Sequence, residues 1–448
     1  MSALINKIKT SILVAGDILT LYLALFLTLF LRYGNNWNEI RENHFIAFSV
    51  IYFFWLLVFY IIGLYDLSIA RNNIYFFVTL AKALVINAFL AVAFFYFFSY
   101  FNITPKTNLF IDLILFAIFF ILWRRFYNQF VKTSALLNNV LVIGQSQESQ
   151  ELIKYIKDNP QLGYRIKKIV DPKEVRILYD LIDAIVQEKI QIVVTSVDPR
   201  KDAELVRNLY QCIPLKVMLA DLPSFYEKIT GKIPISAIEE VWFLENLMTG
   251  RKVFFEALKR VIDILASLAL GLFTLLILPI VSILIKINSP GPIFYRQKRV
   301  GQDNRIFEVL KFRTMFMDAE KNGVQWARKD DLRITGVGKF FRKTRIDELP
   351  QLWNVLRGDM AFVGPRPERP EFAFSNELLA KIPFYQIRHT IKPGLTGWAQ
   401  IKYPYGSSIE DTTQKLQYDL YYIKNRSLAL ELAIILKTIK IILSGGGR

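Results

Sequence analysis

The sequence has almost no cysteine or histidine: of 448 residues, one is Cys and two are His. A single cysteine, Cys212, cannot form an internal disulfide, and these three side chains are too few for a zinc site. Disulfide-stabilised and zinc-binding folds are therefore excluded. Acidic residues are also scarce, because 39 Asp and Glu face 56 Lys and Arg, a net charge of +17. This excess predicts an anionic partner, such as nucleic acid, anionic lipid or a phosphorylated substrate.

Hydrophobic residues make up 53% of the sequence, with 36 Phe among them, which exceeds the roughly 45–50% apolar share of soluble proteins. Four apolar segments fall at 11–31, 45–65, 83–101 and 109–123. Because a bilayer crossing needs about 20 apolar residues, we expect four transmembrane helices in residues 1–125, the fourth being the shortest. Asp17 is expected to face other helices instead of lipid. The alternative is a helical bundle inside a soluble protein.

Lysine and arginine are distributed unequally around these segments. One set of flanks carries Lys7, Lys9, Arg71, Lys82, Arg124, Arg125 and Lys132, and the other carries only Arg32, Arg41 and Lys106. Positive residues favour the cytoplasmic side of a membrane. The amino terminus and everything after Arg125 are therefore predicted to lie in the cytoplasm.

Residues 126–250 show a different pattern, in which short β-branched runs alternate with charged helical stretches. The runs are Val140–Ile143, Ile190–Thr195 and Lys216–Leu219. Such alternation predicts parallel strands joined by crossover helices, a Rossmann-like α/β domain. Gly144 follows the first run, but the other two glycines of G-x-G-x-x-G are missing. We therefore favour a structural domain over one that binds NAD or a nucleotide.

A fifth apolar segment runs from Val261 to Ile285 and contains Pro279. Pro279 removes a helical hydrogen bond and favours a kink. Basic residues flank both ends, so orientation rules do not demand passage across the membrane. From the residues alone, a plain crossing and a re-entrant helix stay equally open.

Positive charge is concentrated after this segment, because residues 286–448 contain 28 Lys and Arg against 16 Asp and Glu, a net +12. Many of these cations lie in short clusters framed by proline or glycine, at Ser289–Arg299, Lys311–Met315 and Gly364–Glu368. Rigid frames with one or two cations suit the recognition of phosphate oxygens. The alternative is loops that face water or anionic lipid. Nucleic acid is a poorer partner, because no basic face interleaved with aromatics is found.

The segment Arg345–Gly358 predicts a helix with an acidic start. Pro350 is tolerated only in a first turn and Gly358 is a natural carboxy-terminal cap, so the helix is expected to begin near Asp347. The helix dipole and Arg345 would keep the Asp347 carboxylate ionised, which a nucleophile requires. The alternative is that Asp347 is only the N-cap.

The Asp347–Glu348 pair and the clusters Ser289–Pro292, Lys311–Met315 and Pro365–Glu368 resemble the bacterial polyprenyl-phosphate sugar-1-phosphate transferases. The whole chain resembles their long, undecaprenyl-phosphate hexose-1-phosphate type. This resemblance implies a membrane protein of mixed class with three parts. They are a four-helix transmembrane bundle (1–125), a cytoplasmic Rossmann-like α/β domain (126–250) and a mostly α catalytic domain (251–448) anchored by a re-entrant membrane helix kinked at Pro279. Leu278 departs from the serine often found before that proline.

The resemblance also implies the chemistry. Asp347 would attack the β-phosphate of a UDP-sugar and release UMP, and undecaprenyl phosphate would then attack the sugar-phosphoryl aspartate. Glu348 would bind Mg²⁺. Asp419 matches an acidic residue near the end of the family's sequences and is also assigned to the metal. The alternative for Asp419 is a charge on a helix surface. His389 is expected to be a surface or core residue instead of a general base. The residues expected to bind substrate phosphates are Lys311, Arg313, Arg366, Arg296 and Arg345.

Two further helices are expected near the end of the chain. Ser408 and Asp411 have the spacing of a capping box that opens a helix. The apolar run Leu428–Leu443 is short for a crossing and predicts a membrane-surface helix, with a buried core helix as the alternative.

These features favour an enzyme of the bacterial inner membrane, with its catalytic domain on the cytoplasmic face, that starts a lipid-linked glycan such as a capsule, O-antigen or exopolysaccharide. Glucose or galactose is the default sugar, and an N-acetylated hexosamine is the alternative. Membrane lipids are expected partners and a homodimer is compatible with the sequence. The competing classes are a transporter with a regulatory cytoplasmic domain and a non-catalytic scaffold; against the transporter, we find no internal repeat.

Overall fold

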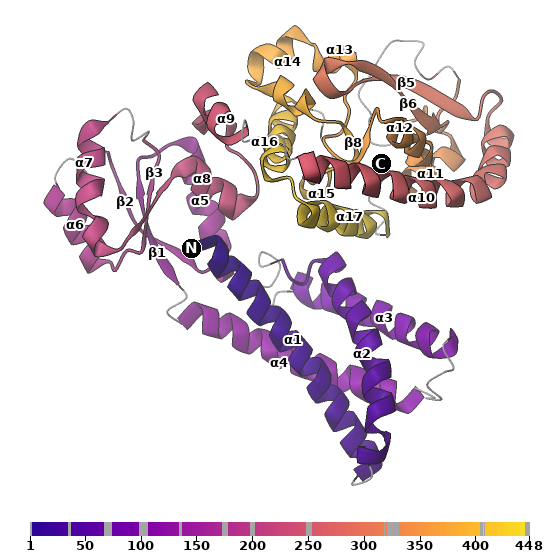
Figure 1. The fold of residues 1–448 in the computed structure, drawn as a ribbon, viewed down its shortest axis with the longest axis horizontal. Helices are drawn as coiled ribbons and strands as arrows, with labels where there is room; N and C mark the ends of the chain where they lie inside the picture. The colour runs from indigo at the N-terminus through magenta and orange to yellow at the C-terminus, as the bar shows by residue number, and fades with distance from the viewer. Residues whose placement is uncertain are drawn as a thin grey trace. The chain divides into compact units, whose positions relative to one another are not determined.

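Figure 1 shows the computed structural model. It describes residues 2–34, 37–66, 74–97, 106–133, 137–172, 178–197, 202–247, 253–317, 319, 331–403, 406 and 408–443. The chain forms two compact units, Met1–Lys228 and Ile229–Arg448.

Four long helices open the first unit: α1 (Ser2–Tyr33), α2 (Trp37–Ile62), α3 (Ile74–Phe97) and α4 (Lys106–Thr133). Aromatic side chains dominate their core, where Trp55, Phe59 and Phe116 are completely buried. In the described part of the chain, four helices are long and apolar enough to cross a membrane, namely α1, α2, α3 and α10 (Val253–Asn288). Helix α4, at the place of the fourth predicted span, packs along α1. Three of the four spans predicted in residues 1–125 are thus long and apolar enough to cross a membrane, and the fourth, 109–123, is not among the candidates.

Buried polar groups hold this bundle together. Asp17 Oδ2 accepts a hydrogen bond from Arg124 Nη2 at 2.6 Å, and Tyr52 Oη donates to Asp112 Oδ1 at 2.8 Å. Asp17 is completely buried. Because a buried charge is tolerated when it is paired and hydrogen-bonded, this ion pair fixes α1 against α4. The prediction that Asp17 faces other helices is confirmed.

A four-stranded sheet completes the first unit. Its strands are β1 (Asn138–Ile143), β2 (Tyr164–Val170), β3 (Ile192–Thr195) and β4 (Met218–Asp221), all parallel and in the order β2-β1-β3-β4. The strands are connected by α5 (Gln147–Asp158), α6 (Leu178–Gln187) and α7 (Ala203–Gln211), with 3-10 turns η3 (Pro160–Leu162) and η6 (Ile213–Leu215), and α8 (Leu222–Thr230) follows β4. The predicted parallel α/β architecture is confirmed.

The geometry of the turn after β1 requires a glycine at position 144. Gly144 has φ +89°, and a Cβ there would meet Ser196 Oγ at 2.1 Å. The next helix begins with a capping box, in which Ser146 Oγ accepts from the Ser149 backbone N–H at 3.2 Å. Ser146 thus occupies a backbone donor that a phosphate would need in a dinucleotide site. This observation supports a structural role for the turn.

The second unit starts earlier than the expected boundary at residue 250. Its first elements are η7 (Ile235–Ala237) and α9 (Glu240–Leu247). The Ile233 N–H donates to Gln417 O at 3.0 Å, and Trp398 Nε1 donates to Gly231 O at 2.8 Å. Residues 229–247 therefore pack with the carboxy-terminal part of the chain instead of the sheet.

The second unit is mostly helical with two small sheets. Strands β5 (Phe294–Val300) and β6 (Ile306–Phe312) form an antiparallel hairpin, and β7 (Ala361–Val363) pairs in parallel with β8 (Gly394–Thr396). Its other elements are η8 (Gln302–Asn304), α11 (Gly336–Thr344), η9 (Ile346–Gln351), α12 (Leu352–Arg357), α13 (Pro370–Ala373), α14 (Asn376–Lys381), η10 (Tyr385–Thr390), α15 (Trp398–Lys402), α16 (Ile409–Asn425) and α17 (Leu428–Leu443).

Helix α10 is 36 residues long and continues through Pro279. Beyond the proline, Val281 and Ile285 are buried in an apolar cluster with Phe312 of β6 and Phe341 of α11. The carboxyl half of α10 therefore packs directly on the elements that surround the predicted nucleophile.

The two helices expected near the chain end are present. Helix α16 begins with the predicted capping box between Ser408 and Asp411. Helix α17 has the predicted bounds, with Ile434 completely buried and Leu432 57% exposed. One face of α17 thus belongs to the core, as the alternative interpretation proposed.

Candidate active site

A short helical segment carries the predicted nucleophile. Helix α11 ends at Arg345, whose φ of +59° is left-handed, and this reversal leads directly into η9. The segment continues through α12 to Gly358, whose φ of +96° allows its N–H to bond Asn354 O at 3.1 Å. The predicted helix and its glycine cap are confirmed. Asp347 lies inside the first turn and Arg345 is the N-cap, so the N-cap interpretation of Asp347 is wrong.

The three-residue period of η9 separates its apolar and acidic side chains. In a 3-10 helix, residues i and i+3 lie on one face. Ile346 and Leu349 pack on the cluster around Val281, so their face is held against α10. Asp347 and Glu348 consequently point to other sides, yet each is only 7% exposed. The fold has therefore buried two neighbouring carboxylates.

Three cations surround Glu348. Arg366 Nη2 lies 2.8 Å and Lys311 Nζ 3.5 Å from Oε1, while Arg345 Nη1 lies 3.1 Å from Oε2. Burial alone would raise the pKa of Glu348, but these cations hold it well below its usual range. Glu348 is therefore ionised and fixed in place.

Asp347 has a different environment. Its Oδ1 has no hydrogen-bond partner among the described residues. Burial and, next, repulsion by Glu348 raise the pKa of Asp347 to about 6. Nearby cations oppose this rise; they are Lys311, Arg342 and Arg345. At neutral pH the carboxylate is still mostly ionised, and one of its oxygens is free of hydrogen bonds, as a nucleophile requires.

Lys311 and Arg366 reach this pair from separate elements. Lys311 lies on β6, and burial lowers its pKa to about 8 although Glu348 favours the charged form. Asn354 of α12 fastens that strand, because its Oδ1 accepts from the Leu310 N–H at 3.0 Å. Arg366 follows β7. These two predicted phosphate-binding residues are thus beside the nucleophile, together with Arg345.

Two other predicted phosphate-binding residues have different contacts. Arg313 is buried and donates to Pro290 O at 2.8 Å and Ser289 O at 2.5 Å, so it fastens the Ser-Pro-Gly-Pro segment. In the hairpin, Arg296 is paired with Leu310 and Lys311 with Tyr295, so Arg296 and Lys311 point to opposite faces. The Arg296 side chain is 74% exposed.

Asp419 belongs to a second buried ionic cluster. It is 1% exposed, and its Oδ2 lies 2.8 Å from Arg388 Nη2. The helix-surface interpretation of Asp419 is therefore wrong. Burial raises the pKa of Asp419 to about 6, while Arg388 opposes the rise. Arg388 also lies 3.8 Å from Glu368 and donates to Arg366 O at 3.1 Å, so it supports the loop that carries Arg366.

His389 is a core residue, as expected. It is 6% exposed and its Nδ1 lies 2.7 Å from Asn304 Oδ1. Burial, with Arg388 beside it, lowers the pKa of His389 to about 4, so the ring is neutral at physiological pH.

Sequence reasoning missed Arg388 and Arg342. Arg342 Nε donates to Thr314 Oγ1 at 3.0 Å, inside the Lys311–Met315 cluster, and its charge acts on Asp347. No predicted element contains Arg342, so the one signal that could have found it is its position five residues before Asp347 in the sequence. Arg388 lies outside every proline-framed cluster, so no local pattern marks it.

A Mg²⁺ ion at this site would need oxygen ligands from the substrate as well as from the protein. Among the described residues, no group of three or more Asp, Glu, His or Cys side chains could hold a metal ion. Mg²⁺ commonly uses one or two carboxylates, with substrate phosphates and water as its other ligands. Glu348 offers such a carboxylate, but both of its oxygens lie beside cations, so a ligand role requires that one of these ion pairs opens. A ligand role for Asp419 requires that its ion pair with Arg388 opens.

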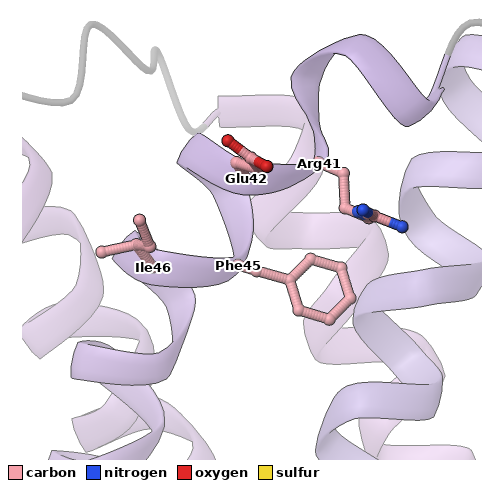
Figure 2. A pocket seen from close by; sticks show the side chains of 4 residues that line it. All are labelled: Arg41, Glu42, Phe45 and Ile46. Carbon is pink, nitrogen blue, oxygen red and sulfur yellow. The ribbon is translucent and has the colours of Figure 1, made fainter.

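A pocket of about 460 Å³ lies elsewhere, lined by Arg41, Glu42, Phe45 and Ile46 of α2 (Figure 2). It belongs to the first unit, and no predicted catalytic residue lines it. The chemistry of the donor groups therefore identifies the candidate active site, around Asp347.

Known proteins resemble the part of the chain that contains Asp347. Residues 254–445 match the family described as bacterial sugar transferase. An Aeromonas hydrophila UDP-N-acetylgalactosamine-undecaprenyl-phosphate N-acetylgalactosaminephosphotransferase is 43% identical, over 54% of this chain and 56% of its own length, so the chain spans about half of that relative.

Two relatives named UDP-glucose:undecaprenyl-phosphate glucose-1-phosphate transferase match more of their length. The Xanthomonas campestris protein is 33% identical over 71% of this chain and 69% of its own length, and the Klebsiella pneumoniae protein is 28% identical over 95% and 93%. The predicted family and the predicted transferase class are confirmed. The chain belongs to the bacterial sugar transferase family.

Proposed function

We propose that this protein transfers a sugar-1-phosphate from a UDP-sugar to undecaprenyl phosphate. One observation carries the proposal: Asp347 is buried and mostly ionised, with an unpartnered oxygen, beside three cations that can bind phosphate. Relatives named for undecaprenyl phosphate support the acceptor. The same names support glucose or N-acetylgalactosamine as donor sugars, and we keep glucose or galactose as the first choice to test.

The reaction would have two displacements at phosphorus. Asp347 Oδ1 attacks the β-phosphorus of the UDP-sugar, and the bond to the bridging oxygen breaks, so UMP leaves with the electron pair. An oxygen of undecaprenyl phosphate then attacks the same phosphorus and releases the Asp347 carboxylate. Lys311, Arg345 and Arg366 would stabilise the negative charge that develops on the phosphoryl oxygens. A Mg²⁺ ion held by Glu348 would supply further charge neutralisation.

We propose that α10 enters the cytoplasmic leaflet and returns to the same side. A crossing would separate the two ends of α10 by the bilayer thickness of about 30 Å. Yet Arg260, near its start, donates to Val355 O of α12, and Lys311, beyond its end, contacts Glu348 of η9. Both flanks of α10 thus contact one short helical segment. Pro279 supplies a place for the bend. The catalytic unit would then face the cytoplasm of a bacterial inner membrane.

Replacing Asp347 with Asn should lower kcat by about 10³-fold or more, because an amide cannot attack phosphorus. The fold should be at least as stable as the wild type, since the raised pKa of Asp347 means that the folded state disfavours its charge. Turnover with each UDP-sugar and the melting temperature in detergent measure these effects. Asp303→Asn, at the exposed hairpin turn, is the matched control. Substantial residual activity would move the nucleophile to Glu348.

Release of UMP should depend on pH through Asp347. Its pKa of about 6 lies above the usual value, so the reactive carboxylate is lost as pH falls through 6. With the UDP-sugar alone, the second-order rate constant of the single release of UMP should be half-maximal near pH 6 and fall about tenfold per pH unit below it. Omitting the acceptor removes the titration of its phosphate. A constant rate from about pH 5 to 8, with the protein folded throughout, would contradict the assignment.

Cysteine labelling tests the topology, because the only cysteine, Cys212, is completely buried. In a Cys212→Ala background, Arg207→Cys and Arg357→Cys should react with an impermeant maleimide only after spheroplasts are permeabilised. Glu42→Cys, between the first two spans, should react in intact spheroplasts. Reaction of Arg357→Cys in intact spheroplasts would show that α10 crosses the membrane.

A further inference from the structure

The first turns of α10 carry three charged side chains, Lys259, Arg260 and Asp263, that have no part in the proposed chemistry. They lie in the helix with the most apolar sequence among the candidate spans. Lys259 is 8% and Asp263 4% exposed. Charged groups buried at this position are costly unless they are paired, so their contacts identify what they stabilise.

Arg260 holds the carboxyl end of α12. Its Nη1 donates to Val355 O at 2.6 Å and its Nη2 to Leu356 O at 2.8 Å. The last carbonyls of a helix lack partners within the helix and carry a partial negative charge, which a guanidinium satisfies. Because α12 continues η9 without a break, Arg260 fixes the position of the helical segment that carries Asp347.

Lys259 and Asp263 hold β7. Lys259 Nζ lies 2.5 Å from Glu431 Oε2 and 3.8 Å from Asp263 Oδ1. Tyr422 Oη in turn lies 2.5 Å from Glu431 Oε1. The same hydroxyl lies 3.1 Å from the backbone carbonyl oxygen of Val363 in β7. Helix α10 also contacts β7 directly.

These contacts connect α10 to the active site by two separate paths. Arg366 follows β7 by three residues, and its Nη2 lies 2.8 Å from Glu348. One path runs from Arg260 through α12 and η9 to Glu348. The other runs from Lys259 through Glu431, Tyr422 and β7 to Arg366. Helix α10 contacts both α12 and β7, and the two paths meet again at the Arg366–Glu348 ion pair.

We propose that Lys259, Arg260 and Asp263 are positioning residues that set Asp347 and Arg366 relative to each other from one region of the membrane helix. The inference rests on the proposed function, since it concerns the geometry of that site. Arg260 acts on the nucleophile, whereas Lys259, with Asp263 beside it, acts on a cation that binds the substrate phosphate. Arg260 and Lys259 should therefore affect different kinetic constants.

The test follows the first burst of UMP after the full-length protein is mixed with a UDP-sugar that the wild type accepts. Burst amplitude counts folded active sites, and burst rate reports the chemical step. Arg260→Ala should lower the burst rate by about 10- to 100-fold, because a displacement of about 1 Å has that effect. Its KM for the UDP-sugar should stay within about threefold of wild type. Lys259→Met, which removes the ion pair with Glu431, should raise this KM as well as lower the rate.

Two further variants separate the effect of the Arg260 contacts from a general effect of changing charge at this end of α10. Arg260→Lys can reach only one of the two carbonyls, so its rate should lie between those of wild type and Arg260→Ala. Glu256→Gln removes a charge from the same end of α10, where Glu256 pairs with Arg426, and should change the rate less than about twofold.

A wild-type rate in Arg260→Ala and Arg260→Lys, with or without a reduced amplitude, would overturn the inference and leave the proposed function intact. Failure of the wild type to release UMP from any UDP-sugar would overturn the proposed function, and this inference with it.

Discussion

Burial of two adjacent carboxylates is the constraint on which the rest of the catalytic unit depends. Asp347 and Glu348 are neighbours in one 3-10 turn and both are nearly inaccessible to solvent. Two buried negative charges at such a separation are unfavourable unless cations compensate them. The compensation is unequal, because the cations bond Glu348 and leave one oxygen of Asp347 without a hydrogen bond. The residue that is left less stabilised is the one suited to react.

Each compensating cation comes from a different element. The end of α11 provides Arg345, the β5–β6 hairpin provides Lys311 and the segment after β7 provides Arg366. Further buried contacts hold these elements, such as Asn354 on β6 and Arg388 on the Arg366 carbonyl. The charge environment of Asp347 therefore depends on the packing of the whole unit, and a substitution far from η9 can alter it.

Helix starts, helix ends and long apolar segments could be predicted from the sequence, because each depends on neighbouring residues. Pro350 and Gly358 were sufficient to place the helical segment with Asp347 in its first turn, and the Ser408–Asp411 spacing placed the start of α16. Long apolar runs predicted the candidate spans. The proline-framed clusters led to Lys311 and Arg366, which do lie beside Glu348.

Contacts between distant segments could not be predicted in the same way. Arg296 and Lys311 belong to similar basic clusters, and only the strand register shows that they point to opposite faces. Arg313 resembles a phosphate ligand in sequence, yet its donors bond backbone carbonyls 23 and 24 residues away. Asp419 was assigned a surface alternative because its partner Arg388 lies in a segment without a recognisable motif. The boundary after Lys228 also depends on contacts with residues that follow much later.

Mass spectrometry of the purified protein, after incubation with a UDP-sugar and no polyprenyl acceptor, tests most directly whether Asp347 is the nucleophile. We expect one sugar-phosphoryl group per active site, on the peptide that contains Asp347, formed together with one UMP and removed by hydroxylamine. Release of UMP only when the acceptor is present, with no adduct on the protein, would contradict this role of Asp347.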